Sequence, residues 1–76
     1  MARVRSKVGF ALCIDNTDAE DLERGKVYLT RPDASAKREG YVRVVDESGE
    51  DYLYPESYFV PVELPEKAKD ALLAAG

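Results

Sequence analysis

Five short stretches of this 76-residue chain are rich in apolar residues, and in some of them apolar and polar positions alternate. The pattern is clearest in residues 26–30 and 41–46, where successive side chains switch character as they do on a half-buried strand. Residues 10–15 alternate only weakly, and residues 50–54 and 59–63 are expected to be strands because they are rich in aromatic and β-branched residues. The pattern therefore predicts a mainly β fold with five strands.

Turn residues separate the last three of these strands. Gly49 ends residues 47–49 and accepts the positive φ of a tight hairpin, so strands 41–46 and 50–54 are expected to pair. Pro55 lacks the N–H of a strand ladder, and a short 3₁₀ turn is expected before the last strand. Pro61 inside that strand predicts a position at the sheet edge.

The two longer connections are polar. Residues 16–25 form an acidic loop, in which residues 19–24 are expected to make a helical turn capped by Asp18. Residues 32–40 begin with a proline that ends the preceding strand, and they have room for one further helical turn.

A C-terminal helix is expected over residues 66–75. Pro65 suits the first helical position, and the acidic start of the segment suits the helix dipole. The chain is thereby divided into a basic, flexible segment (residues 1–9), a β domain (residues 10–63) and a C-terminal helix (residues 64–76) that packs on or beside the domain.

Five tyrosines are too many for the core of so short a chain. The inner face of the sheet is expected to carry Val27, Leu29, Val42, Val44 and Leu53. The opposite face is expected to carry Tyr28, Tyr52 and Tyr54. Exposed tyrosines favour interfaces, because one end of the ring is apolar and the other forms hydrogen bonds.

The formal net charge of −4 argues against nucleic acid as the main partner, since phosphates are usually neutralised by a basic face. The single cysteine cannot form an internal disulfide, which favours a reducing cytoplasm. Residues 1–14 place basic residues and a short apolar run before Cys13. That run (residues 8–14) is too short for a signal peptide and for a membrane span.

The sequence gives little support to catalysis or to metal binding. The chain has no histidine, so neither a Ser–His nor a Cys–His pair can form, and Cys13 is expected to be a small buried hydrophobe. A calcium-binding EF-hand loop that starts at Asp15 would place Ala19, Glu20 and Lys26 at its fifth, sixth and twelfth positions, where the motif needs other residues. The sequence predicts a protein that is not an enzyme and holds no metal or cofactor.

Two short motifs resemble the Src-homology 3 (SH3) family. Ala-Leu-Cys-Ile-Asp of residues 11–15 resembles the family's Ala-Leu-Tyr-Asp-Tyr strand, and Pro-Glu-Ser-Tyr of residues 55–58 resembles its Pro-Ser-Asn-Tyr turn, which residues 59–63 follow as a strand. Residues 46–63 are also similar to short, uncharacterised bacterial SH3-like proteins. The resemblance covers residues 10–63 and implies a five-stranded SH3-like barrel.

The same resemblance implies a binding surface. SH3 domains clamp proline-rich peptides between aromatic rings, but here Cys13 replaces one ring and the chain has no tryptophan, so this ligand is not expected. In SH3 domains the acidic loop holds a basic residue of the ligand. The predicted partner-binding surface therefore consists of Asp15, Asp18, Glu20, Asp21, Tyr54, Pro55 and Tyr58.

The predicted function is that of a small cytoplasmic protein-interaction module or accessory subunit, monomeric or weakly homodimeric. An alternative is a barrel associated with nucleic acid or the ribosome that uses a basic stripe. That stripe would consist of Arg3, Arg5, Lys7, Lys26, Arg38 and Arg43. A third interpretation is that the acidic loop only keeps the protein soluble and guards strand edges.

Overall fold

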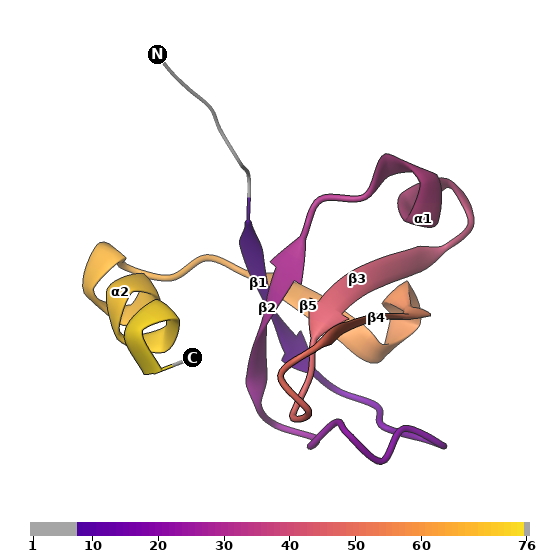
Figure 1. Cartoon of the computed structure of the whole chain (residues 1–76), viewed down its shortest axis with the longest axis horizontal. Helices are drawn as coiled ribbons and strands as arrows, with labels where there is room; N and C mark the ends of the chain where they lie inside the picture. The colour runs from indigo at the N-terminus through magenta and orange to yellow at the C-terminus, as the bar shows by residue number, and fades with distance from the viewer. Residues whose placement is uncertain (1–7, 76) are drawn as a thin grey trace.

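The computed structural model describes residues 8–75 and shows one antiparallel sheet of five strands (Figure 1). The strands are β1 (Gly9–Cys13), β2 (Val27–Arg31), β3 (Tyr41–Val45), β4 (Asp51–Pro55) and β5 (Phe59–Val62). The helical elements are α1 (Ala34–Arg38), the 3₁₀ turn η1 (Glu56–Tyr58) and α2 (Glu66–Ala75). The mainly β fold, the 3₁₀ turn before the last strand and the C-terminal helix are confirmed.

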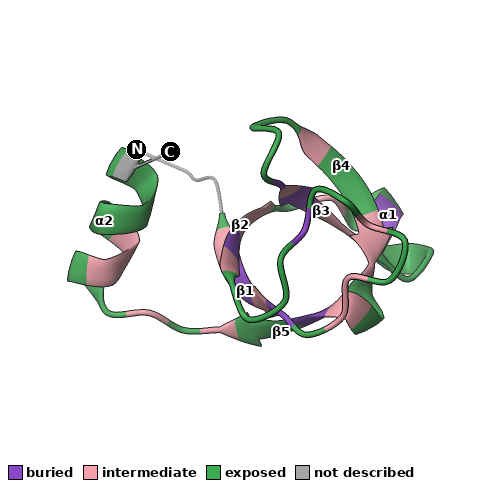
Figure 2. Cartoon of the chain, turned by 90° about the horizontal axis from the view of Figure 1, so that it is seen from below, coloured by how far each residue is buried: buried purple, intermediate pink, exposed green. Residues whose placement is uncertain are grey.

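The sheet is strongly curved but does not close into a barrel (Figure 2). Its strand order is β4-β3-β2-β1-β5, so β4 and β5 are the two edges, and within residues 8–75 they do not pair. The sheet is therefore open, which corrects the expectation of a closed barrel. Pro55 and Pro61 lie on these two strands, and neither residue has an N–H to donate to a ladder between them.

The core lies on the concave face of the sheet. Its buried residues are Ala11, Cys13, Leu22, Tyr28, Val44 and Phe59. The ring of Phe59 packs edge-on to Tyr28, with centroids 6.4 Å apart, and to Tyr54, with centroids 6.3 Å apart. Three aromatic rings thus supply much of the apolar area that stabilises a domain of this size.

The predicted assignment of strand faces is correct for β3 and wrong for β2 and β4. Val44 is fully buried, as expected, but Tyr28 is also inside with only 6% of its surface exposed. Leu53 points outward and is 45% exposed. The register explains this arrangement, because Val42 lies opposite Tyr54, so β4 turns its tyrosines and not Leu53 toward the face that holds Val44.

Helix α1 is confirmed in the connection between β2 and β3, and Asp33 fixes it in place. The carboxylate of Asp33 accepts a hydrogen bond from Ala36 N (3.0 Å) at the start of the helix. It also accepts from Arg43 of β3, with 2.9 Å to Nε and 2.8 Å to Nη2. The N–H of Ala36 and the guanidinium of Arg43 lower the pKa of this carboxyl below its usual value.

Helix α2 follows an extended link and lies beside β1 and β2, on the side of the molecule away from β4 (Figures 1 and 2). The carbonyl of Pro65 accepts hydrogen bonds from Ala68 N (3.0 Å) and Lys69 N (3.1 Å), which begins the helix. Leu72 and Leu73 are 39% and 50% exposed. No helix within the described residues is long and apolar enough to cross a membrane.

Candidate functional site

The acidic loop is a series of turns between β1 and β2. Ala19 N donates to Asn16 O (3.0 Å) and Leu22 N donates to Ala19 O (3.2 Å). Leu22 is only 3% exposed and anchors the loop in the core. The expected helical turn over residues 19–24 is wrong, because this segment forms separate turns. Asp18 has φ 59° instead of the extended backbone of an N-cap, and its carboxylate accepts no hydrogen bond from a described residue.

Tyr54 and Tyr58, the two tyrosines of the predicted partner-binding surface, hold this region together by hydrogen bonds. The hydroxyl of Tyr58 donates to the carbonyl of Thr17 in the acidic loop (2.7 Å). The hydroxyl of Tyr54 donates to Asp46 Oδ2 (2.6 Å) at the start of the β3–β4 hairpin. Pro55 lies between them and precedes η1. Both hydroxyl groups are therefore engaged within the protein, and both residues are partly buried against the core.

Backbone contacts join the acidic loop to the hairpin. Glu47 N donates to Asp21 O at 3.0 Å, and Asp46 N pairs with Glu50 O at 3.1 Å to close the hairpin. The loop and the hairpin consequently lie at the same end of the sheet (Figure 1). We call this region the acidic end. Its carboxylates are those of Asp15, Asp18, Glu20, Asp21, Glu47 and Glu50.

The carboxylates of the acidic end differ in their engagement. Asp15 accepts from Thr17 N (3.0 Å) and Thr17 Oγ1 (2.7 Å) and so shapes the start of the loop. Asp18, Glu20 and Asp21 are exposed, and their carboxylates form no ion pair or hydrogen bond with any other described residue. These three charges are presented to solvent from a loop whose backbone is fixed.

Glu47, like Asp15, is engaged within the protein, through Oε2 of its carboxylate. It accepts hydrogen bonds from Lys26 Nζ (2.6 Å) and from the hydroxyl of Tyr28 (2.6 Å). Lys26 and then Tyr28 hold the pKa of Glu47 below its usual range, and Glu47 in turn raises the pKa of Lys26. Burial, with the hydrogen bond to Glu47, raises the pKa of Tyr28, which therefore stays protonated at neutral pH.

The structure brings the predicted site residues together at one end of the molecule. Burial raises the pKa of Tyr58, and the carboxylates of Asp15 and Asp18 raise it further, so the tyrosine lies within the field of the loop. Burial and then the carboxylate of Asp46 are the larger causes that raise the pKa of Tyr54, and the carboxylate of Asp21 raises it further. Asp46 itself was missed by sequence reasoning, because no local pattern marks it as the acceptor for a tyrosine eight residues away.

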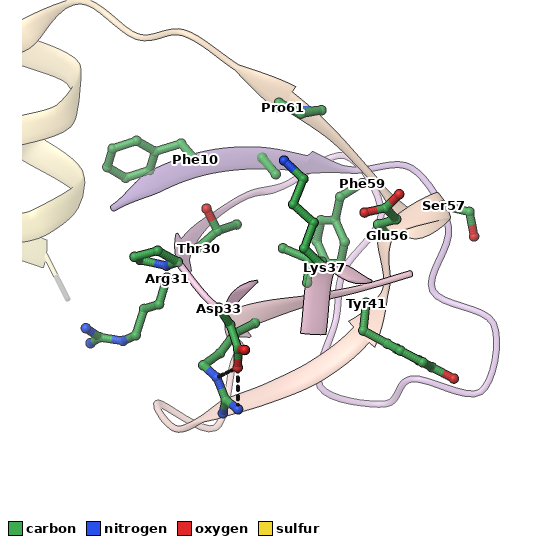
Figure 3. Close-up of a pocket in the computed structure, with 14 residues that line it drawn as sticks. Phe10, Thr30, Arg31, Asp33, Lys37, Tyr41, Glu56, Ser57, Phe59 and Pro61 are labelled. Carbon is green, nitrogen blue, oxygen red and sulfur yellow. Dashed lines mark hydrogen bonds and ion pairs between the residues drawn. The ribbon is translucent and has the colours of Figure 1, made fainter. Parts of the chain in front are cut away.

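A groove that the sequence did not indicate lies at another position, between α1, η1 and β5 (Figure 3). Its volume is about 540 Å³, and Val42, Phe59 and Pro61 contribute apolar walls. Lys37 from α1 and Glu56 from η1 add opposite charges to the lining. The groove has the size and polarity to receive an apolar side chain. Nothing in the linear pattern marks it, because its lining residues come from six elements: β1, β2, α1, β3, η1 and β5.

The described residues give little support to a metal site or to nucleic-acid binding by the basic stripe. Between residues 8 and 75, no three Cys, Asp or Glu side chains are placed to hold a metal ion. Lys26 pairs with Glu47, and Arg43 pairs with Asp33 and Asp51, so neither cation is free for phosphate. Arg38 of α1 is exposed, donates to Ser35 Oγ (3.4 Å) and forms no ion pair with another described residue, whereas Arg3, Arg5 and Lys7 lie outside the described residues.

The cysteine of β1 is expected to be unreactive in the folded protein. Cys13 is 1% exposed, and burial raises the pKa of its thiol above the usual value. Modification by N-ethylmaleimide at pH 7, followed by mass spectrometry, should therefore be more than about tenfold slower for the native protein than for the protein in urea. Equal rates in the two conditions would contradict the buried placement.

Comparison with known proteins does not assign the chain to a family. The chain matches no family model, no curated protein and no solved structure.

Proposed function

We propose that this protein is a non-enzymatic protein-interaction module with an SH3-like fold, acting as a binding domain or accessory subunit in the bacterial cytoplasm. The acidic end is its binding surface, and the partner is a protein segment that carries Arg or Lys residues. The observation that carries the proposal is a set of three exposed carboxylates that pair with no other residue in the described part of the chain, on a loop that Tyr58 and the hairpin hold in place.

Preorganisation supports a binding role for this loop. A flexible acidic loop loses conformational entropy when it binds, whereas this loop is already tied down by the Tyr58 hydroxyl and the buried Leu22. Tyr54 and Tyr58 are partly buried and lie near the carboxylates, and the accessible part of each ring is available for cation–π contact with an Arg side chain. Charge attraction and ring contact together favour a basic segment over an acidic or purely apolar one.

The SH3-like assignment rests on the order and connection of the strands as well as on the two motifs. β1 and β2 are joined by the acidic loop, β3 and β4 by a tight hairpin, and β4 and β5 by the 3₁₀ turn η1. The Pro-Glu-Ser-Tyr motif (residues 55–58) lies at that turn. In this arrangement the acidic loop and the turn meet at one surface, as the resemblance implies.

Charge reversal at the loop is expected to abolish binding of a basic peptide. Glu20→Lys combined with Asp21→Lys reverses two exposed carboxylates and raises the net charge from −4 to 0. The measurement is a titration of ¹⁵N-labelled protein with a short peptide of alternating Arg and aromatic residues, followed by NMR. We expect shifts centred on residues 15–22 and 54–58, and affinity at least about tenfold weaker in the double variant.

A matched control separates a specific surface from general charge attraction. Glu63→Lys with Asp70→Lys also changes the net charge from −4 to 0, but at exposed positions outside the acidic end. The control should bind the peptide much as the wild type does. Equal weakening in both double variants, or shifts spread evenly over the molecule, would count against the proposal. Asp18 is left unchanged because its left-handed backbone favours Asp or Asn over Lys.

A further inference from the structure

The backbone hydrogen bonds of the β3–β4 ladder determine which groups of β4 face outward. Asp46 N donates to Glu50 O, and ladder pairs of the same kind recur every second residue in an antiparallel hairpin. Two residues further along each strand, Val44 lies opposite Tyr52. Tyr52 therefore directs its N–H and C=O toward β3.

The residues on either side of Tyr52 direct their backbone groups the other way. Asp51 and Leu53 point their N–H and C=O groups out of the sheet, and neither N–H donates a hydrogen bond to any described residue. Pro55, the next residue on this edge, has no N–H. The free edge of β4 thus offers two donors, with acceptors beside each of them.

The opposite edge of the sheet offers no such donors. Ile14 N donates to Tyr58 O (2.8 Å), so Tyr58, and Val60 two residues on, face β1. Phe59 and Pro61 face outward, but the N–H of Phe59 donates to the carbonyl at the start of η1, and Pro61 has none to donate. Within the described residues, β5 is closed to strand addition and β4 is open.

We propose that two copies of this chain associate through their β4 edges. The two strands run antiparallel about a twofold axis at Tyr52, so that Asp51 of each copy lies opposite Leu53 of the other. Each such pair exchanges two N–H···O=C bonds, and all four outward N–H groups are then satisfied. A second copy fits because the edge is self-complementary: its donors and acceptors are placed symmetrically about one residue.

The side chains of β4 suit the same arrangement. Tyr52 is 49% exposed and would lie directly opposite its counterpart, a close cross-strand position that favours aromatic pairs. Asp51 brings a negative charge to the edge, but Arg31 and Arg43 lie 3.5 Å and 3.7 Å from it and compensate that charge. The β4 edge therefore does not present Asp51 as an uncompensated negative charge.

Sedimentation velocity on the full chain, from about 10 µM to about 1 mM, tests this proposal. The wild type is expected to shift from monomer to dimer across this range. Leu53→Pro removes one outward N–H from each copy and no hydrogen bond within the monomer, so it is expected to remain monomeric throughout. A wild type that stays monomeric at every concentration, or a Leu53→Pro variant that dimerises normally, overturns the proposal.

Two further variants keep the result decisive. Leu53→Lys places a charge on the edge and should also prevent dimerisation, and it decides the matter alone if circular dichroism shows that Leu53→Pro is unfolded. Val60→Lys is the matched control, because Val60 is 44% exposed on the opposite edge strand and Leu53 is 45% exposed. Val60→Lys should dimerise like the wild type, and its failure to do so would count against the β4 edge.

This proposal is independent of the proposed function. The measurement uses the pure protein without peptide, and Asp51 and Leu53 are not part of the acidic end. The Glu20→Lys, Asp21→Lys variant is therefore expected to dimerise like the wild type while failing to bind the basic peptide. Each proposal can fail without the other.

Discussion

Phe59→Ala is expected to remove a large part of the free energy of unfolding of the protein. Phe59 is 7% exposed and packs edge-on against both Tyr28 and Tyr54, so its ring joins β2, β4 and β5 in one core. Truncating a buried phenylalanine to alanine costs about 3–5 kcal/mol. A chain of 76 residues has a free energy of unfolding of about 4–11 kcal/mol, so this loss is a large part of the total.

Urea denaturation followed by tyrosine fluorescence and far-ultraviolet circular dichroism measures the effect. The midpoint should fall by about 2–3 M if the slope is near 1.5 kcal/mol/M. The next residue of the same strand, Val60, is 44% exposed, and Val60→Ala should cost less than about 1 kcal/mol. If the two variants lose similar stability, Phe59 does not occupy the centre of the core.

The elements of this fold were predictable where a single residue determines local geometry. Gly49 has φ 87° in the hairpin turn, as the sequence required. Pro61 lies on an edge strand, and Pro65 introduces α2. In each case the information is local, because a glycine accepts positive φ and a proline lacks an N–H wherever it stands. The bounds of the strands accordingly agree with the prediction to within two residues.

The faces of β2 and β4 were not predictable in the same way. From the sequence, either Tyr28 or its neighbours Val27 and Leu29 could face the core. A shift of the strand by one residue moves every side chain to the opposite face of the sheet. The structure buries Tyr28 because its hydroxyl reaches Glu47, which is 19 residues away. Such a partner becomes visible only after the hairpin and β2 have been placed side by side.

The candidate site, too, was predictable from the sequence only in part. The resemblance to SH3 domains placed the acidic loop beside the turn that contains Tyr58, and the structure brings them together. It did not indicate that the tyrosine hydroxyls are structural, nor that the groove near Lys37 exists. The open edge of β4 is also a property of the pairing register, since no residue of Asp51–Pro55 by itself shows which N–H groups face outward.

Removal of the Asp46 carboxylate is the second large effect that we expect. Asp46 is 5% exposed, and its side chain accepts hydrogen bonds from the hydroxyl of Tyr54 (2.6 Å), from Ser48 N (3.0 Å) and from Ser48 Oγ. Asp46→Ala leaves the hydroxyl of the partly buried Tyr54 without its partner and removes the two hydrogen bonds that hold the exposed Ser48 in the hairpin turn. Hydrogen bonds to a charged group contribute about 1.5–3 kcal/mol, so a loss of about 2–3 kcal/mol is expected.

A double-mutant cycle with Tyr54→Phe isolates the contact between the two side chains. Tyr54→Phe keeps the ring against Phe59 and removes only the hydroxyl, so it should cost about 0.5–1.5 kcal/mol. If the hydroxyl and the carboxylate act together, the double variant should be less destabilised than the sum of the two single variants. Strict additivity would mean that the hydrogen bond contributes no net stability.

The dependence of stability on pH gives an independent test of the same carboxylate. Burial raises the pKa of Asp46, but the hydrogen bonds from Ser48 and Tyr54 outweigh it and leave the pKa below its usual value of 3.8. A carboxyl whose pKa is lower in the folded state stabilises the fold fully above its unfolded pKa. This contribution is lost as the pH falls below about 3.8 and through the folded pKa.

The free energy of unfolding of the wild type should therefore decrease between pH 5 and pH 2, and part of that decrease should be missing in Asp46→Asn. The remainder belongs to Asp15, Asp33 and Glu47, whose pKa values are lowered in the same direction. Urea denaturation at several pH values measures both curves. Parallel curves for the wild type and Asp46→Asn would show that Asp46 has the same pKa in the folded and unfolded chain. The hydrogen bond from the Tyr54 hydroxyl would then not stabilise the charged form of Asp46.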